Sequence, residues 1–343
     1  MTQSNNLLLV RAARGERTER TPVWLMRQAG RYLREYQALR QQYGFMEICR
    51  QPELAARVSL LPWQAFEPDG VVMFSDIMFP LSGMNIEFSL EDGGPKVAQP
   101  VRTLADTQRI CELPQLDDCV VCVQQLIQHL KTELAGRAAV IGFAGAPFTL
   151  ATYLVEGQKS QELEIIKRLM YTQPEVLKAL LQKLTDSLIT YCQAQADAGA
   201  DVLQLFDTWA GMLSTPDYER WALPYQQQVF SALKNKLPTL LFVRAATGYL
   251  ELLKLSGAGC ISLDWRIEIP KARAILGADF PVQGNLDPAV LLGDIKHVEA
   301  ETKRLIAAGG HRGHILNLGH GLLPSTPREN VQRFIEISKT HTV

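Results

Sequence analysis

The sequence predicts an α/β protein that folds as a single (β/α)8 barrel of the TIM type. Short, continuous apolar runs recur along the 343 residues, and runs of this kind form buried parallel strands. Helix-compatible sequence or a short crossover separates each run from the next, which favours a parallel sheet. Seven such runs can be counted, and this number is close to the eight strands of a barrel. We expect one catalytic domain over residues 1–343, with residues 1–6 as a flexible tail.

The first ordered stretch, residues 22–40, reads PVWLMRQAGRYLREYQALR. If it is helical after Met26, Arg27 and Arg31 stand four residues apart on one face, with Arg34 close by. Two guanidinium groups on one face bind carboxylates or phosphates, because each pairs bidentately and keeps its charge. A solvated basic face is the alternative, but Gly30 and the interleaved aromatic residues favour a ligand site.

The remaining elements follow in order. Pro52 suits a first helical turn, and residues 83–100 alternate around a turn at Gly93-Gly94, which predicts a hairpin. Helices are expected at 52–66, 105–111, 118–134, 148–155, 161–170 and 174–198. Strands are expected at 71–74, 139–143, 202–206, 239–243, 260–263, 280–283 and 315–318. An eighth strand can be placed around Trp24 or around Ile86.

Composition excludes several classes of protein. Hydrophobic residues make up 47% and charged residues 21%, as in an ordinary globular protein. A net charge of −1 argues against general binding to nucleic acid or to an anionic membrane. The apolar run 7–10 is too short for a signal peptide, and the six unevenly spaced cysteines do not form a disulfide framework. We therefore expect a cytoplasmic protein.

Polar residues gather at the ends of the predicted strands, which meet at one mouth in a barrel. Asp76 is the best candidate for a buried acid, because apolar residues and Pro80 follow it instead of a helix start. His320 lies between two glycines, and Tyr153 follows a glycine-rich strand end. Helix capping or core packing is the competing interpretation of such residues, and it applies equally well to Asp207, Asp264 and Asp287.

No motif indicates a cofactor or a metal. Cys119 and Cys122 form a C-x-x-C in a helical segment, but no second pair and no histidine lie at ligand spacing. Nucleotide-binding loops, zincin motifs and nucleophile elbows are missing from the sequence. We expect neither a cofactor nor a metal.

Several segments together resemble the uroporphyrinogen decarboxylase family. PVWLMRQAGRYL and GFAGAPFTLATYLVEG, at residues 22–33 and 142–157, are similar to its two signatures. Shorter matches follow in the family's order at FSDI (74–77), FDTWAG (206–211), LDW (263–265), QGNLDP (283–288) and NLGHG (317–321). The resemblance covers nearly the whole chain.

The resemblance implies a barrel that decarboxylates the four acetate arms of uroporphyrinogen III without a cofactor and gives coproporphyrinogen III. It implies Arg27 and Asp76 as catalytic residues, with Arg27 as the favoured proton donor acting with Asp76. The implied substrate-binding residues are Arg27, Arg31, Arg40, Asp76, Tyr153, Thr208 and His320. A homodimer is also implied. Two positions differ from the family: Arg34 replaces the usual Pro, and Thr208 replaces a common Ser but keeps the hydroxyl.

Two other functions compete with this one. A related barrel family, the cobalamin-dependent methyltransferases, binds zinc through His-x-Cys and a distant Cys. Residues 243–248 read VRAATG here and no cysteine follows His320, so these ligands are absent. A non-catalytic carrier of polyanionic tetrapyrroles would need Arg27 and Arg31 but would not need Asp76.

Overall fold

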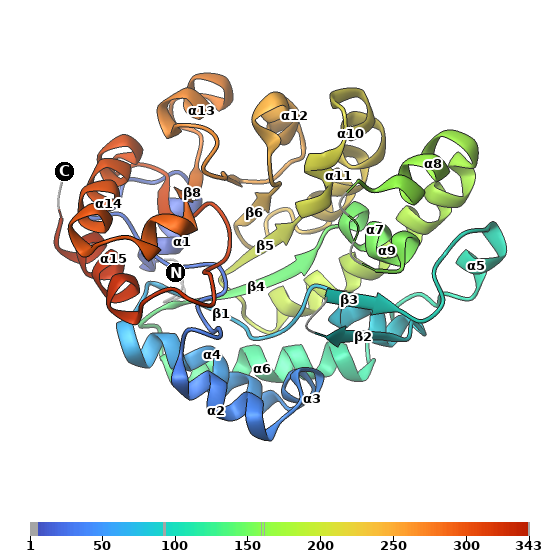
Figure 1. Ribbon diagram of the computed structural model, residues 1–343, viewed down its shortest axis with the longest axis horizontal. Coiled ribbons are helices and arrows are strands. Elements are labelled where there is room, and N and C mark those ends of the chain that lie inside the picture. Colours follow the sequence, from blue (N-terminus) through green and yellow to red (C-terminus); the bar gives the residue numbers. More distant parts are fainter. Residues whose placement is uncertain (1–5, 92–93, 159, 161, 342–343) are drawn as a thin grey trace.

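The computed structural model describes residues 6–91, 94–158, 160 and 162–341. Within this part, seven parallel strands form one curled sheet in the order β1-β4-β5-β6-β7-β8-β9, with helices outside it (Figure 1). The strands are β1 (Gly70–Val72), β4 (Ala139–Gly145), β5 (Val202–Phe206), β6 (Thr239–Phe242), β7 (Cys260–Ser262), β8 (Val282–Leu286) and β9 (His314–Leu318). Six of these strands begin and end within two residues of their predicted bounds. β8 starts two residues later and ends three residues later than predicted. The barrel prediction is confirmed.

The segment around Val23 occupies the gap between the two edges of this sheet. Val23 forms a parallel bridge to Leu316 of β9, and the Leu316 amide donates to the Pro22 carbonyl at 2.8 Å. On the other side, the Asp69 amide donates to the Val23 carbonyl at 2.8 Å, directly before β1. The segment therefore takes the position of an eighth strand, as the placement around Trp24 predicts. Ile86 lies outside the barrel, just before the hairpin.

A buried polar cluster inside the barrel fixes this segment. The Trp24 indole N–H donates to Gln283 Oε1 at 2.7 Å. The Gln283 amide in turn donates to Gln204 Oε1 and to Ser262 Oγ, both at 2.9 Å. Because the three partners come from β8, β5 and β7, the indole is tied to strands across the barrel. The chain leaves this anchor with Arg27 at the mouth.

The predicted helix directly after Met26 is wrong, because residues 26–32 form turns and α2 (Arg34–Gln42) starts only later. The backbone of Arg27 is left-handed, with φ of 61°. The buried Gln28 side chain accepts from the Leu25 amide at 3.1 Å and donates to the Gly70 carbonyl at 3.1 Å. Bonds to the barrel thus hold this backbone out of helical geometry, and Arg27 and Arg31 share no helix face.

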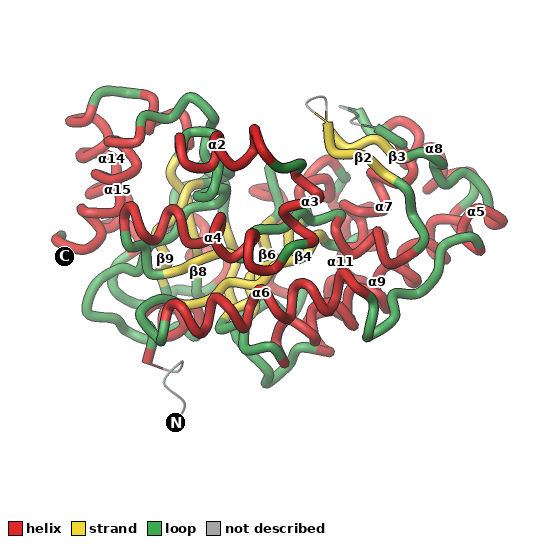
Figure 2. The backbone as a smooth tube through the Cα atoms, turned by 90° about the horizontal axis from the view of Figure 1, so that it is seen from below, coloured by secondary structure: helices red, strands yellow, loops and turns green. Residues whose placement is uncertain are grey.

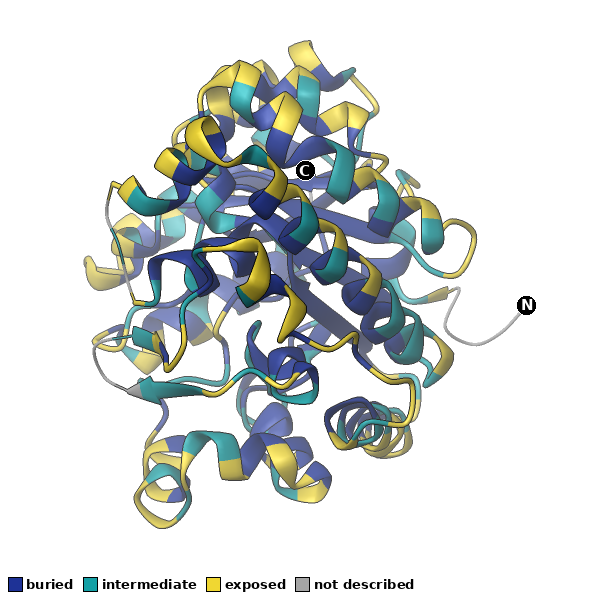
Figure 3. Cartoon of the chain, turned by 90° about the vertical axis from the view of Figure 1, so that its right-hand side faces the viewer, coloured by how far each residue is buried: buried dark blue, intermediate teal, exposed yellow. Residues whose placement is uncertain are grey.

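Helices surround the sheet and turn their buried faces to it (Figures 1 and 3). α4 (Pro52–Phe66) and α6 (Asp118–Leu134) match their predicted bounds and pack against each other. The other helices are α1 (Leu8–Ala13), α3 (Phe45–Arg50), α5 (Leu104–Gln108), α7 (Pro147–Glu156), α8 (Glu164–Thr172), α9 (Pro174–Asp197), α10 (Thr215–Trp221), α11 (Leu223–Ala232), α12 (Leu250–Leu255), α13 (Ile269–Leu276), α14 (Ile295–Gly309) and α15 (Arg328–Thr340). Among the described helices, none combines the length and the apolar character needed to span a membrane.

A hairpin extends from the barrel after β1. Its strands β2 (Phe88–Glu91) and β3 (Gly94–Val97) pair antiparallel, which confirms the alternating pattern. Gly94 opens β3, whereas Gly93 of the predicted turn lies outside the described residues, as do residues 1–5 of the predicted tail and Gln161 at the predicted start of α8. The hairpin and α2 lie on the same side of the molecule (Figure 2).

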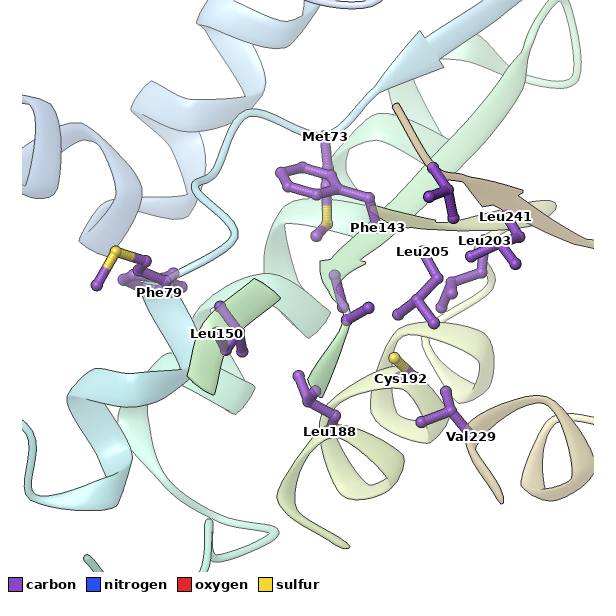
Figure 4. Packing of buried hydrophobic residues seen from close by; sticks show 14 of the residues in the cluster. Met73, Phe79, Phe143, Leu150, Leu188, Cys192, Leu203, Leu205, Val229 and Leu241 are labelled. Carbon is purple, nitrogen blue, oxygen red and sulfur yellow. The ribbon is translucent and has the colours of Figure 1, made fainter. Parts of the chain in front are cut away.

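The strands carry a different apolar cluster on each face. Outward-facing Leu203, Leu205 and Leu241 pack against α9 and α11, with Leu188, Cys192 and Val229 as partners (Figure 4). Inward-facing side chains form a separate cluster with Leu9, Val10, Ala12 and Ala13 of α1. A Cβ at Gly70 would meet Leu9 Cδ1 at 2.7 Å, so α1 packs against the amino ends of the strands. This closes one end of the barrel and leaves the carboxyl ends as the mouth.

Candidate active site

Five of the seven predicted site residues lie at the mouth. Arg27 follows the Val23 segment, Asp76 follows β1, and His320 follows β9. Tyr153 lies on α7, which begins two residues after β4 ends, and Thr208 opens the 3-10 helix η3 (Thr208–Met212) after β5. Because parallel strands end at one edge, these residues approach one another from separate parts of the sequence.

The exposed Arg27 side chain lies across Gly321. A Cβ at position 321 would stand 2.6 Å from Arg27 Cγ and 2.9 Å from Nε, and real Cβ atoms do not come so close. The Arg27 charge lowers the pKa values of Asp76, Tyr153 and His320. Among the described residues it forms no ion pair, so Arg27 is a cation held in place and open to an anionic ligand.

Asp76 presents a partly buried carboxylate at the same mouth. Burial raises the pKa of its carboxyl above the ordinary value, while the Met78 amide and the Arg27 charge act in the opposite direction. Oδ1 accepts from the Met78 amide at 2.9 Å, and Oδ2 accepts no hydrogen bond from the described residues. Contrary to prediction, a 3-10 helix, η2 (Phe79–Met84), starts close behind Asp76, but Asp76 does not cap it.

Tyr153 faces Trp209, the residue after Thr208. Their rings meet edge to face with centroids 6.0 Å apart. Burial raises the pKa of the Tyr153 hydroxyl; the Trp209 side chain lowers it, the Asp76 charge raises it and the Arg27 charge lowers it. The hydroxyl is therefore protonated at neutral pH and lies within the fields of both Asp76 and Arg27.

A buried network around Asp207 holds the turn that carries Thr208 and Trp209. Asp207 Oδ1 accepts from Thr149 Oγ1 at 2.7 Å, and its Oδ2 accepts from Gln226 Nε2 at 2.7 Å. Thr149 Oγ1 also accepts from the Trp209 amide at 3.1 Å. Burial raises the pKa of Asp207 to about 6. Asp207 joins α7 and α11 to η3 and does not cap η3, whereas Asp287 does cap its own turn by accepting from the Ala289 amide at 2.9 Å.

His320 is a largely buried imidazole whose ring meets Phe242 edge to face, with centroids 5.9 Å apart. Its pKa is lowered to about 4, mainly by burial and also by the charges of Arg27 and Arg244. The ring is neutral at pH 7 and can offer one donor and one acceptor. A Cβ at Gly319 would stand 2.6 Å from the Trp265 amide nitrogen, so the glycine before His320 permits close packing against the end of β7.

Arg31 and Arg40 form a second basic pair, with Arg31 just before α2 and Arg40 in its last turn. Both charges act on the Tyr36 hydroxyl, where they lower a pKa that burial raises. Arg40 Nη1 donates to the Tyr43 carbonyl at 2.7 Å, and its guanidinium lies 5.7 Å from the Phe45 ring centroid. The Arg40 charge also acts, together with the Asp76 charge, on the Cys49 thiol, whose pKa burial raises.

Sequence reasoning missed part of the mouth. Asp264 was considered only as a possible helix cap, and no role was assigned to Arg244, Arg266 or Trp209. Arg266 stands two residues after a strand-end aspartate, and that position was an available signal. Among the described residues, no three His, Cys, Asp or Glu side chains are grouped to hold a metal ion. Cys119 and Cys122 are free thiols on α6.

Comparisons with known proteins agree with this architecture. The family model described as Uroporphyrinogen decarboxylase (URO-D) matches residues 4–341. A relative named uroporphyrinogen decarboxylase from Gloeobacter violaceus is 45% identical over 99% of this chain and 98% of its own. One of the same name from Synechococcus sp. (strain JA-3-3Ab) is 47% identical over 96% of this chain and 91% of its own.

Among solved structures, a methyltransferase from Methanosarcina mazei superposes with a TM-score of 0.81 over 97% of both chains. Its sequence identity is 21%, so this likeness shows the fold alone. The family model and the two relatives align over nearly the full length of the chain and identify its family. This chain belongs to the uroporphyrinogen decarboxylase family.

Proposed function

We propose that this protein converts uroporphyrinogen III into coproporphyrinogen III with release of four CO2, in tetrapyrrole biosynthesis. Family membership supports the reaction. The observation that carries the proposal is the partly buried carboxylate of Asp76, on which the Arg27 charge acts. Within the part of the chain that the structure describes, Asp76 Oδ2 accepts no hydrogen bond and Arg27 forms no ion pair. A carrier of anionic tetrapyrroles has no use for a carboxylate there, because it would repel the ligand.

The reaction sets three requirements for a protein. An acetate arm on a pyrrole loses CO2 once the ring is protonated on carbon, because the resulting iminium accepts the electron pair of the broken C–C bond. The substrate ring is thus its own electron sink. The protein must orient the ring, deliver a proton and stabilise the transient positive charge.

Asp76 meets the requirement for charge stabilisation. As a carboxylate, it would accept hydrogen bonds from pyrrole N–H groups through Oδ2, and it would stabilise the cation that ring protonation creates. Electrostatic stabilisation of this kind is strongest in a site that excludes water. Burial raises the pKa of the Asp76 carboxyl, which indicates that water is partly excluded here. The Arg27 charge favours the ionised form of this carboxyl, against the effect of burial.

Arg27 delivers the proton in our proposal. Its side chain is held against Gly321 and acts on Asp76, so proton donor and charge stabiliser stand on neighbouring strand ends. A guanidinium seldom acts as an acid because its pKa exceeds about 12. Transfer to the pyrrole carbon is driven by the irreversible loss of CO2 that follows.

The remaining predicted residues bind the substrate. Tyr153, Thr208 and neutral His320 supply hydrogen-bonding groups around the rim, with Thr208 providing a hydroxyl where the family commonly has Ser. Arg31, just before α2, and Arg40, in its last turn, would attract carboxylates that project from the macrocycle edge. No cofactor is assigned to the reaction.

We also propose that residues 1–343 act as one domain, in the cytoplasm, as a homodimer. All six cysteines are free thiols, as is usual in a reducing compartment. The dimer follows from the family resemblance and from the prevalence of two-fold symmetry in oligomers. Light scattering of the purified protein tests it, and a monomeric mass contradicts it.

The test of the reaction is anaerobic incubation with reduced uroporphyrinogen III and excess chelator. Products are oxidised and separated by carboxylate number. We expect porphyrins with seven to four carboxylates to appear in steps. Binding without turnover would favour the carrier, and activity lost only with chelator would reopen metal-dependent chemistry of the methyltransferase kind.

A further inference from the structure

The mouth has a second cationic region, made by Arg244 after β6 and Arg266 after β7. Arg244 is exposed and, among the described residues, makes no ion pair or hydrogen bond. Arg266 is also accessible, with 41% of its side chain exposed. Neither residue was predicted to take part in binding, and both follow strands whose carboxyl ends face the mouth.

Arg266 is held by the end of its own strand. Its Nη1 lies 2.6 Å from Asp264 Oδ2, an oxygen that also accepts from the Ala245 amide at 2.6 Å. Asp264 Oδ1 accepts from the Arg266 amide at 3.0 Å. The guanidinium also lies 4.7 Å from the Trp265 ring centroid. The buried Asp264 therefore fixes both the Arg266 guanidinium and the backbone next to Arg244.

The backbone of Arg244 is fixed from the other side. A Cβ at Gly211 would collide with the Arg244 carbonyl oxygen, so η3 packs directly on this residue. The loop after β6 is thus held between the turn that carries Thr208 and the end of β7. Only the side chain of Arg244 is left to move.

Strand order places this region across the mouth from Arg27. Counting the Val23 segment as one of eight barrel positions, β6 is four steps away in either direction, which is the opposite side of the barrel. The rings of Phe242 and His320 meet within this span. The charges of Arg27, Arg244 and Arg266 all act on His320, and they add to the lowering of its pKa by burial, which is the largest effect. Cations therefore surround the mouth from both sides.

We infer that Arg244 and Arg266 form a carboxylate-binding subsite that holds the far side of the macrocycle. The inference rests on the proposed function, since a ring with eight carboxylates projects anions in every direction. Arg27 lies on one side only, and Arg31 and Arg40 belong to the segment that follows it and continues into α2. Arg244 and Arg266 supply opposing contacts that fix the ring over Asp76, and Asp264 serves as the positioning residue for Arg266.

The experiment compares Arg244→Gln and Arg266→Gln with Arg312→Gln. Arg312 is exposed at the amino end of β9, at the closed end of the barrel, so its substitution removes the same charge away from the mouth. We expect each mouth variant to raise the KM for uroporphyrinogen about tenfold, the loss of one charged hydrogen bond, with a much smaller change in kcat. Arg244→Lys should recover part of the loss.

Two further readouts separate this inference from the proposed reaction. The dissociation constant of uroporphyrin, followed by its fluorescence, should rise about tenfold in the mouth variants whether or not the protein turns over substrate. The salt dependence of binding should become shallower. Wild-type turnover with unchanged KM and unchanged uroporphyrin affinity in both mouth variants would overturn the subsite, as would an equal loss in Arg312→Gln.

Arg266→Gln leaves Asp264 without its side-chain partner and lowers stability. Arg244→Gln breaks no contact in the described part of the chain, so it decides the matter if Arg266→Gln fails to fold. An Arg244→Gln protein with wild-type Tm and weaker uroporphyrin binding supports the subsite, and one with wild-type binding overturns it.

Discussion

Arg27 crosses Gly321 so closely that no side chain larger than hydrogen fits between them. The contact joins the segment before α2 to the loop after β9. It involves Arg27, whose backbone is left-handed and whose charge acts on Asp76. Glycine is needed at position 321 for this reason, and the requirement can be tested without altering any charged group.

Gly321→Ala should lower kcat/KM about 10–100-fold, because a shift of roughly 1 Å in a catalytic group has this effect. The measurement is steady-state decarboxylation of uroporphyrinogen III. Gly310→Ala, in the loop between α14 and β9, is a control: a Cβ there would meet nothing within 4 Å, so only the strain of its φ of 63° is added. Equal activity of Gly321→Ala and wild type would contradict the positioning role of the contact.

Asp76→Asn should lower kcat about 10²–10³-fold, since it removes the charge that stabilises the protonated ring. The Tm should stay the same or rise, because burial raises the pKa of this carboxyl and so opposes the charged form. Chromatography of the products and a thermal melt provide the two measurements. Full activity of Asp76→Asn would refute the mechanism and leave family membership untouched.

Acid should destabilise the fold through two buried histidines. Burial lowers the pKa values of His314 and His320 to about 4, below the ordinary value near 6.5. Unfolded chains therefore bind more protons between pH 6.5 and 4, so the free energy of unfolding falls as pH falls through this window and is flat above it. The slope is at most about 1.4 kcal/mol per pH unit for each histidine.

Asp207 acts in the opposite direction over nearly the same range. Its pKa is raised to about 6, so the folded protein binds more protons between pH 4 and 6, and this contribution grows as pH falls. Denaturant unfolding at pH 4.5 and 7.5 measures the net effect. His320→Asn should reduce the loss on acidification, and an unchanged difference between the two pH values would show that His320 is not buried neutral.

Asp207→Asn should destabilise the protein by about 1–3 kcal/mol. Thr149 and Gln226 both donate to the carboxylate, so the NH2 group of an asparagine would face one of these donors and leave a hydrogen bond unmade. Tm and KM should change together, since the network holds η3 and Thr208. Asp287→Asn is the matched control: this aspartate caps its own turn on the surface and should change stability by only a few tenths of a kcal/mol. If Asp207→Asn and Asp287→Asn both kept the wild-type KM, the Asp207 network would not be needed to position the substrate-binding residues.

The sequence was sufficient for the barrel because buried parallel strands are short apolar runs whose ends carry polar residues, as in 202–206 and Asp207. The same pattern predicted that Asp76 and His320 follow strand ends, as they do after β1 and β9, while their roles stay predictions. The helix after Met26 could not be predicted correctly, because Gln28 bonds to Gly70, a long-range contact that overrides local helix preference. Arg266 was missed because its position depends on the buried Asp264 oxygen, which a sequence pattern does not reveal.

The hydrogen bond from the Leu316 amide to the Pro22 carbonyl joins two residues near opposite ends of the sequence. Contacts between such distant residues form slowly, because much of the chain must be ordered first. During synthesis, Arg27 leaves the ribosome early but has no fixed position until β9 and Gly321 have followed. A nascent chain interrupted before residue 314 would carry every predicted catalytic residue and still lack an assembled site, so cells gain no activity from incomplete copies of this enzyme.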